Sequence, residues 1–120
     1  MQGIRGAVTV ENDTKEEVIS CVSEMLTKIL AENDLSTEDI GAAIFSATKD
    51  ITSVFPAFAA RCLSGWDLVP LFDAQQLYIE NSLKKCIRVL LLVNTDKTQA
   101  QIKHVYLGRA AHLRPDLKAK

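Results

Sequence analysis

The chain has 120 residues, of which 48% are hydrophobic and 24% are charged, and its formal net charge is −1. This length and composition predict one globular domain over residues 1–120. The near-zero charge argues against a broad cationic surface for nucleic acid or for an anionic membrane. The chain has no apolar run near the roughly 20 residues of a membrane span and no secretory signal, so we expect a cytoplasmic protein.

The predicted elements follow one another as strand, long helix, strand, short helix, strand, strand, short helix and strand. The long helix covers residues 13–33, where Thr14 and Glu17 form a capping box and apolar residues recur at helical spacing. The predicted strands are 3–11, 42–47, 67–73, 87–93 and 105–113, and the predicted short helices are 52–66 and 96–105. This order predicts an α/β (α+β) fold whose five-stranded mixed sheet carries one long and two short helices. Pro70 favours an edge position for its strand.

The strand at 87–93 places a charge on an apolar surface. Successive strand residues alternate between two faces, so Arg88 shares a face with Cys86, Leu90 and Leu92. Neither face is polar, and one long helix covers a single face, so we expect self-association to cover the other. A buried arginine needs a partner, which makes the partner of Arg88 the central question.

Several polar residues in or beside apolar segments fit either a structural role or a role in ligand binding. The residues Arg5, Arg61, Arg88 and Arg114 all lie in or beside apolar segments. One such arginine usually pairs with a carboxylate or with backbone carbonyls, whereas several converging arginines form a receptor for a small polycarboxylate. Asp73 and Tyr106 fit either structural or ligand-binding roles at their strands. No metal site, serine nucleophile motif or phosphate-binding loop is present in the sequence pattern.

Motifs distributed along the chain resemble a known family. They are GIRGA at 3–7, TVE at 9–11, SAT at 46–48, VFPA at 54–57, SGW at 64–66, LKKCIRV at 83–89, HVYL at 104–107 and LRPDL at 113–117. Each motif alone is weak, but their order and spacing together are specific. The chain resembles the AroH-type monofunctional chorismate mutases, which are the trimeric α/β class.

This resemblance implies a pseudo-barrel homotrimer with active sites between subunits. It also implies the cofactor-free rearrangement of chorismate to prephenate, on the route to phenylalanine and tyrosine. Arg88 matches the arginine at the substrate's ether oxygen, Arg5 the arginine at a substrate carboxylate, and Tyr106 the neighbouring hydroxyl. The remaining matches are Phe55, Ala57 and Arg61 from the adjacent subunit, Leu71 and Phe72 in the pocket wall, and Leu113 and Arg114 in a mobile tail, about 113–120, that closes over the site.

Two positions depart from the family pattern. Gln76 stands where the family has a glutamate that orients the key arginine, and Asp73 stands where it has a small thiol or hydroxyl residue. We therefore expect Asp73 to be the permanent neighbour of Arg88 and to take over the glutamate's role, while Gln76 supplies a neutral hydrogen bond. Phe58 replaces a lysine found in one relative, which predicts a less cationic pocket rim.

Two other functions fit parts of the same pattern. Small trimeric proteins of the imine-deaminase type also bind carboxylates through an interface arginine, and fold alone does not separate them. A non-enzymatic trimer that senses an aromatic-pathway metabolite is the third interpretation, favoured only by Gln76. The full set of motifs favours the mutase.

Overall fold

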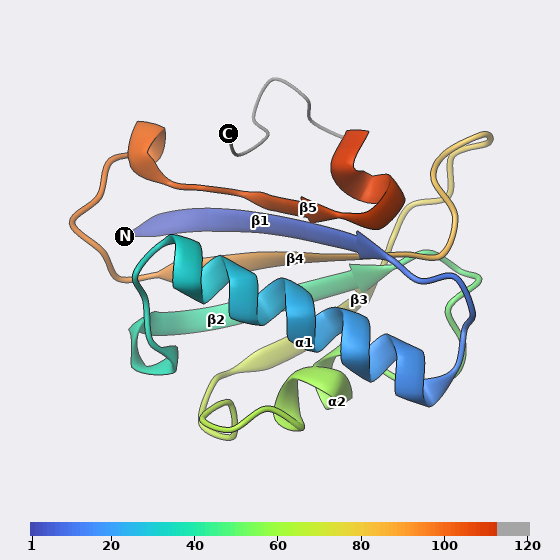
Figure 1. Cartoon of the computed structure of the whole chain (residues 1–120), viewed down its shortest axis with the longest axis horizontal. Helices are drawn as coiled ribbons and strands as arrows, with labels where there is room; N and C mark the ends of the chain where they lie inside the picture. The colour runs from blue at the N-terminus through green and yellow to red at the C-terminus, as the bar shows by residue number, and fades with distance from the viewer. Residues whose placement is uncertain (113–120) are drawn as a thin grey trace.

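The computed structural model describes residues 1–112, so the predictions for Leu113, Arg114 and the tail at 113–120 lie outside the described residues. Within these residues, a five-stranded sheet carries two helices on one face (Figure 1). The elements are β1 (Gln2–Thr9), α1 (Lys15–Glu32), β2 (Ile40–Ala47), α2 (Pro56–Arg61), β3 (Leu71–Gln75), β4 (Cys86–Val93) and β5 (Val105–Leu107). The prediction of a mixed five-stranded sheet with one long helix is confirmed.

The strand order in the sheet is β3-β2-β4-β1-β5. β1 runs parallel to β5 and β2 parallel to β3, while β4 is antiparallel to both of its neighbours. β4 therefore lies in the centre and β3 at an edge. Pro70 directly precedes β3, which agrees with the edge position expected from a residue that has no N–H to donate.

Helix α1 covers one face of the sheet. At its start, the Thr14 hydroxyl accepts a hydrogen bond from the backbone N–H of Glu17 at 3.2 Å, which is one half of the predicted capping box. The other half is absent, because the Glu17 carboxylate accepts the N–H groups of Glu11 and Asn12 rather than that of Thr14. Its buried stripe consists of Val18, Val22, Met25, Leu26 and Ile29. The helix lies close to β1 because Gly6 has no side chain, and a Cβ there would stand 2.7 Å from Cδ1 of Ile29. The packing of the long helix thus depends on one glycine of the first strand.

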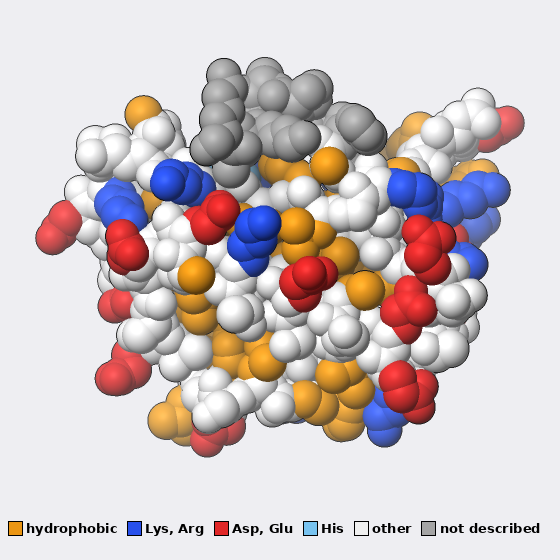
Figure 2. All heavy atoms as spheres, in the orientation of Figure 1, with side chains coloured by type: hydrophobic (Ala, Val, Ile, Leu, Met, Phe, Trp, Pro, Cys, Tyr) orange, Lys and Arg blue, Asp and Glu red, His pale blue; other side chains and the backbone are white. Residues whose placement is uncertain are grey.

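Helices cover one face of the sheet, whereas the other face carries exposed apolar side chains. On β4, the side chains of Ile87, Val89, Leu91 and Val93 are buried under the helices, which confirms the predicted alternation. The opposite face, which we call the open face, carries the exposed apolar side chains of Ile44, Phe72 and Leu90. Figure 2 shows the helix-covered side, where acidic and basic side chains are interspersed. The described residues thus leave apolar surface on the open face.

Several predicted elements are shorter than expected, among them the first short helix, predicted over 52–66 and observed at Pro56–Arg61. The second short helix, predicted over 96–105, is a single 3-10 turn at Gln99–Gln101, which the side chain of Gln101 closes by accepting the N–H of Thr98 at 2.9 Å. The last strand ends at Leu107 because Gly108, at φ +62°, turns the chain into a 3-10 helix at Gly108–His112. The strand predicted over 67–73 begins only at Leu71.

Candidate active site

The central feature of the open face is a row of side chains across all five strands. Arg88 on β4 pairs with Ser46 on β2 and with Ala7 on β1. Ser46 pairs in turn with Ala74 on β3, and Ala7 pairs with Tyr106 on β5. Directly paired residues share a face of the sheet, so these five side chains point the same way. Because the neighbours of Arg88 in this row are small, its guanidinium stands in a hollow.

This hollow is a cavity of about 400 Å³, which we call the arginine cavity. Its lining residues are Arg5, Gly6, Ala7, Ile44, Ser46, Arg88, Val89, Leu90 and Tyr106. Three of the four predicted catalytic residues, Arg5, Arg88 and Tyr106, therefore meet in one place although they come from three strands. Two guanidinium groups and one phenol make a site suited to a small anion that carries carboxylates. Their catalytic roles stay predictions.

Arg88 has no carboxylate partner within the described chain. The ion pair found in residues 1–112 joins Lys97 to Asp34 at 3.6 Å, and neither residue lies on β4. The Nε atom of Arg88 is buried and has no hydrogen-bond partner there. The pKa of the neighbouring Cys86 thiol is raised by burial, in spite of the charge of Arg88, which lowers it. The cation thus stands half-buried without a countercharge from residues 1–112.

Asp73 does not fill this need, which corrects the expectation that it is the permanent neighbour of Arg88 in the same chain. Asp73 pairs with Phe45, and Phe45 pairs with Val89, so the carboxylate lies on the helix-covered face. There it accepts the backbone N–H of Ala57, in the first turn of α2, at 3.0 Å. Burial raises the pKa of Asp73, opposed by this hydrogen bond and by the charge of Arg61.

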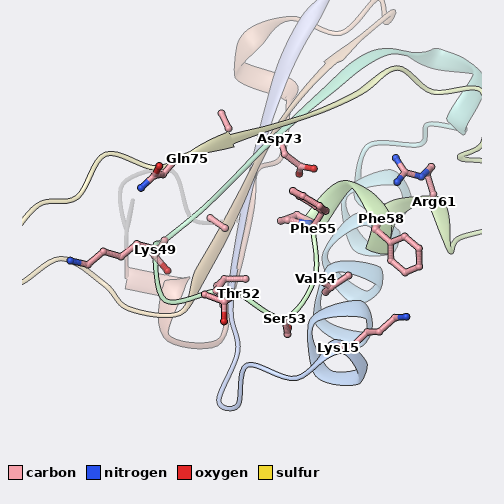
Figure 3. Close-up of a pocket in the computed structure, with 15 residues that line it drawn as sticks. Lys15, Lys49, Thr52, Ser53, Val54, Phe55, Phe58, Arg61, Asp73 and Gln75 are labelled. Carbon is pink, nitrogen blue, oxygen red and sulfur yellow. The ribbon is translucent and has the colours of Figure 1, made fainter.

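A second cavity, of about 700 Å³, adjoins α2 and β3 and collects other predicted residues (Figure 3). It is lined by Phe55, Arg61 and Asp73, together with the cations Lys15 and Lys49. The Phe55 side chain is 71% exposed although it is large and apolar. This second cavity, which we call the α2 cavity, shares no lining residue with the arginine cavity.

The aromatic ring of Phe58 stands between two cations at this α2 cavity. The Nζ atom of Lys15 lies 5.0 Å from the ring centroid, and the guanidinium carbon of Arg61 lies 6.0 Å from it. Both distances are in the range of cation–π attraction. Phe58 itself adds no charge to the rim of the α2 cavity. Two cations, Lys15 and Arg61, nevertheless lie beside its ring.

The remaining predicted residues of β3 alternate between the faces. Leu71 is partly buried against the core under α2, whereas Phe72 is 65% exposed on the open face. Ala57 is buried and contributes its backbone N–H to Asp73. Gln76 follows β3, and its backbone N–H donates to the carbonyl of Ala47 at 3.1 Å. Its Oε1 atom is buried without a hydrogen-bond partner in the described residues and borders a third cavity, of about 270 Å³.

Sequence reasoning missed Ser46, the polar side chain nearest to Arg88 in its row across the sheet. Ser46 was not among the predicted site residues, yet the strand register places it directly beside Arg88. Only the pairing of β2 with β4 reveals this neighbour, because the two residues are 42 positions apart in the sequence (88 minus 46). Among residues 1–112, no group of three or more His, Cys, Asp or Glu side chains is arranged to hold a metal ion. In the same range, no helix has the length and apolar character to cross a membrane.

Comparison with known proteins agrees with this site. The family model for chorismate mutase type I matches residues 1–117. The chain is 50% identical over 117 residues to the chorismate mutase AroH of Bacillus subtilis, covering 98% of this chain and 92% of that protein. It is 48% identical over 120 residues to the chorismate mutase AroH of Thermus thermophilus, covering 99% and 98% of the two chains.

A solved structure supports the same relationship. The chorismate mutase from Clostridium thermocellum superposes with a TM-score of 0.88 at 42% identity, covering 92% of this chain and 97% of that one. The likeness therefore extends over most of the chain rather than over a single motif. The chain belongs to the chorismate mutase type I family and is an isomerase.

Proposed function

We propose that this protein converts chorismate to prephenate, on the route to phenylalanine and tyrosine, with Arg88 as the principal catalytic residue. The observation that carries the proposal is the Arg88 cation, half-buried without a countercharge from residues 1–112, beside Arg5 and Tyr106 in the arginine cavity. The reaction is an intramolecular rearrangement in which a C–O bond breaks while a C–C bond forms. It needs no nucleophile and no proton transfer, which suits a cavity of cations and one phenol.

Catalysis then depends on conformation and on charge. The flexible dicarboxylate must be held in its compact reactive conformer, and fixed cations that bind its two ends do this. As the ether C–O bond breaks, negative charge grows on that oxygen. A guanidinium N–H that points at this oxygen binds more strongly in the transition state than in the ground state, which is the condition for accelerating the chemical step. Arg88 takes this role, and Arg5 and Tyr106 hold a carboxylate.

A second subunit completes the site in this proposal. Within one chain, Arg5, Arg88 and Tyr106 line the arginine cavity, whereas Phe55, Arg61 and Asp73 line the α2 cavity. A neighbouring copy that covers the apolar open face brings its own α2 segment, with Phe55, Ala57 and Arg61, to the arginine cavity. We therefore infer a pseudo-barrel homotrimer with sites between subunits. Asp73 then approaches Arg88 from the adjacent subunit.

The remaining predicted residues complete the proposed site. Leu71 and Phe72 form part of the pocket wall, and Gln76 offers its Oε1, which is buried without a partner in residues 1–112. Leu113 and Arg114 close the site from the tail. One domain over residues 1–120 and a cytoplasmic location stay predictions.

A direct assay tests the proposal. Purified protein is mixed with chorismate, and the loss of the diene absorbance is followed, for the wild type and for Arg88→Ala. We expect rapid loss with the wild type and a reduction in kcat/KM of about a thousandfold in the variant, the upper range for removing a transition-state donor. Lys28→Ala, which removes an exposed cation of α1, is the control and should match the wild type.

The outcomes separate function from mechanism. No acceleration by the wild type contradicts the mutase function. Acceleration that survives Arg88→Ala contradicts the role of Arg88 but leaves the function intact. Chorismate binding without turnover supports the sensor instead.

A further inference from the structure

The pairing of β5 with β1 ends just before Arg5. β5 pairs with β1 over three positions only, Gly6 with Val105, Ala7 with Tyr106 and Val8 with Leu107. The next residue of β1 toward the N-terminus is Arg5, and its backbone N–H donates to the Nδ1 atom of His104 at 2.9 Å. A histidine ring thus takes the place of a strand carbonyl at the end of the ladder.

This hydrogen bond fixes the state of the ring. A backbone N–H can only donate, so Nδ1 must accept and therefore carries no proton. The imidazole that makes this contact is neutral, with its proton on Nε2. His104 is thereby an acceptor that holds the backbone of a residue 99 positions away in the sequence.

The chain before His104 is itself held firmly. Asn33, the buried C-cap residue of α1, donates from Nδ2 to the carbonyl of Lys103 at 2.9 Å. Its Oδ1 accepts the N–H of the same residue at 2.8 Å. Both backbone groups of Lys103 are thus bonded to one side chain that is only 1% exposed. The position of the His104 ring follows from this clamp, because the ring belongs to the next residue.

We propose that His104 is a positioning residue for the reaction, which acts by holding the backbone of Arg5 so that its guanidinium enters the arginine cavity. The proposal rests on the proposed function of Arg5. The connection runs from the end of α1 through Asn33 and the backbone of Lys103 to the His104 ring, and from there to Arg5. Asn33, Lys103 and His104 are not among the residues that line the arginine cavity. The expected consequence of losing this connection is weaker substrate binding, while the step controlled by Arg88 is preserved.

Two substitutions of similar size distinguish this role from simple packing. In His104→Asn the side-chain oxygen is attached to Cγ, where histidine carries Nδ1, so the acceptor is retained. In His104→Gln the oxygen lies one bond further out, near the place of Nε2, so the acceptor is displaced. We expect kcat/KM of His104→Asn within about twofold of the wild type, whereas His104→Gln raises KM about fivefold, the worth of one hydrogen bond, with kcat nearly unchanged.

A second measurement does not depend on turnover. Hydrogen exchange of the Arg5 amide, followed by NMR, should be slow in the wild type and in His104→Asn and faster in His104→Gln. In an Arg5→Ala background, the substitution His104→Gln should lower kcat/KM no further, because a residue that acts through the Arg5 guanidinium has nothing left to position.

Three results would contradict the positioning role of His104. If His104→Asn and His104→Gln lower kcat/KM equally, or if His104→Gln lowers kcat as much as kcat/KM, the positioning role is wrong. A further loss in the Arg5→Ala background also overturns it. These results are ratios between variants of an active enzyme, so they are distinct from a wild type without activity, which contradicts the proposed function. In that case the Arg5 amide exchange still decides whether His104 holds this backbone.

Discussion

The two faces of the sheet differ in how they bond the polar groups of the site. On the helix-covered face, the Asp73 carboxylate accepts the N–H of Ala57 and the Asn33 amide bonds Lys103, although Oε2 of Glu32, at the end of α1, is buried without a partner in residues 1–112. On the open face, Nε of Arg88 is buried without a hydrogen-bond partner in these residues, and the same holds for Oε1 of Gln76, which follows β3 and borders the third cavity. A buried polar atom without a partner costs roughly 1–3 kcal/mol. The helix-covered face stabilises the chain, whereas the open face keeps polar groups available to a ligand or another subunit.

Central strand β4 joins these two roles in a single segment. Leu91 is fully buried under the helices, and the adjacent Leu90 is 37% exposed on the open face. Both are leucines of the same strand, which lies between β1 and β2. They therefore provide a matched pair for separating the stability of the chain from assembly of the site.

The largest effect on stability is expected for Leu91→Ala. Loss of a buried leucine side chain leaves a cavity in the core, so the free energy of unfolding should fall by about 3 kcal/mol in urea titration. Leu90→Ala should change this free energy by less than about 1 kcal/mol in the isolated chain but should weaken self-association, measured as mass against concentration by light scattering. Equal effects of both substitutions on unfolding, with an unchanged mass, would contradict the division between the faces.

Burial on α1 and β4 follows from the sequence because periodicity is a local property. The stripe of α1 and the alternation along β4 are each encoded within one element, so both were predictable. The face of the sheet on which Asp73 lies was not predictable from the sequence, because it depends on the register of β3 against β2. A shift of one residue reverses every side chain of a strand, and nothing within residues 71–75 determines that register.

The site was predictable to a different degree from the fold. Arg5, Arg88 and Tyr106 were brought together by family resemblance, since no local pattern relates three strands so distant in sequence. Ser46 and the contact of His104 with Arg5 are consequences of strand pairing. The helix predicted at 96–105 failed because a single capped turn at Gln99–Gln101 gives the same local signal as the start of a helix.

The two glycines of β1 allow the two faces of the sheet to be compared by adding one methyl group to each. A Cβ at Gly6, on the helix-covered face, would stand 2.7 Å from Cδ1 of Ile29 and 3.2 Å from Sδ of Met25. A Cβ at Gly3, on the open face, would come no closer than 3.3 Å, to Cδ1 of Leu90. We expect Gly6→Ala to lower the free energy of unfolding by about 2 kcal/mol through overpacking and Gly3→Ala to leave it within about 0.5 kcal/mol. Thermal and urea unfolding of both variants measure this difference, and a more sensitive Gly3 would reverse the assignment of the faces.

The smallest effect is expected for Asp73, whose carboxylate lies on the opposite face of the sheet from Arg88 in its own chain. If it serves the site of a neighbouring subunit, Asp73→Asn should lower kcat/KM about tenfold, because it removes a charged hydrogen-bonding partner of Arg88. Gln76→Ala should have the smaller effect, since it removes a neutral group. Unchanged turnover in Asp73→Asn, together with complete loss in Gln76→Ala, would show that the carboxylate has not moved to position 73.

Mixing subunits tests whether Asp73 and Arg88 belong to different chains of one site. When Arg88→Ala and Asp73→Asn proteins are unfolded, mixed and refolded together, some interfaces combine an intact Arg88 from one chain with an intact Asp73 from the next. Activity should then rise above the mean of the two proteins refolded separately. The matched control is a mixture of Arg88→Ala and Arg5→Ala, whose substituted residues line the same cavity of one chain. Every site in that mixture keeps one defect, so recovery there, or its absence in the first mixture, would mean that the two faces do not meet across a subunit boundary.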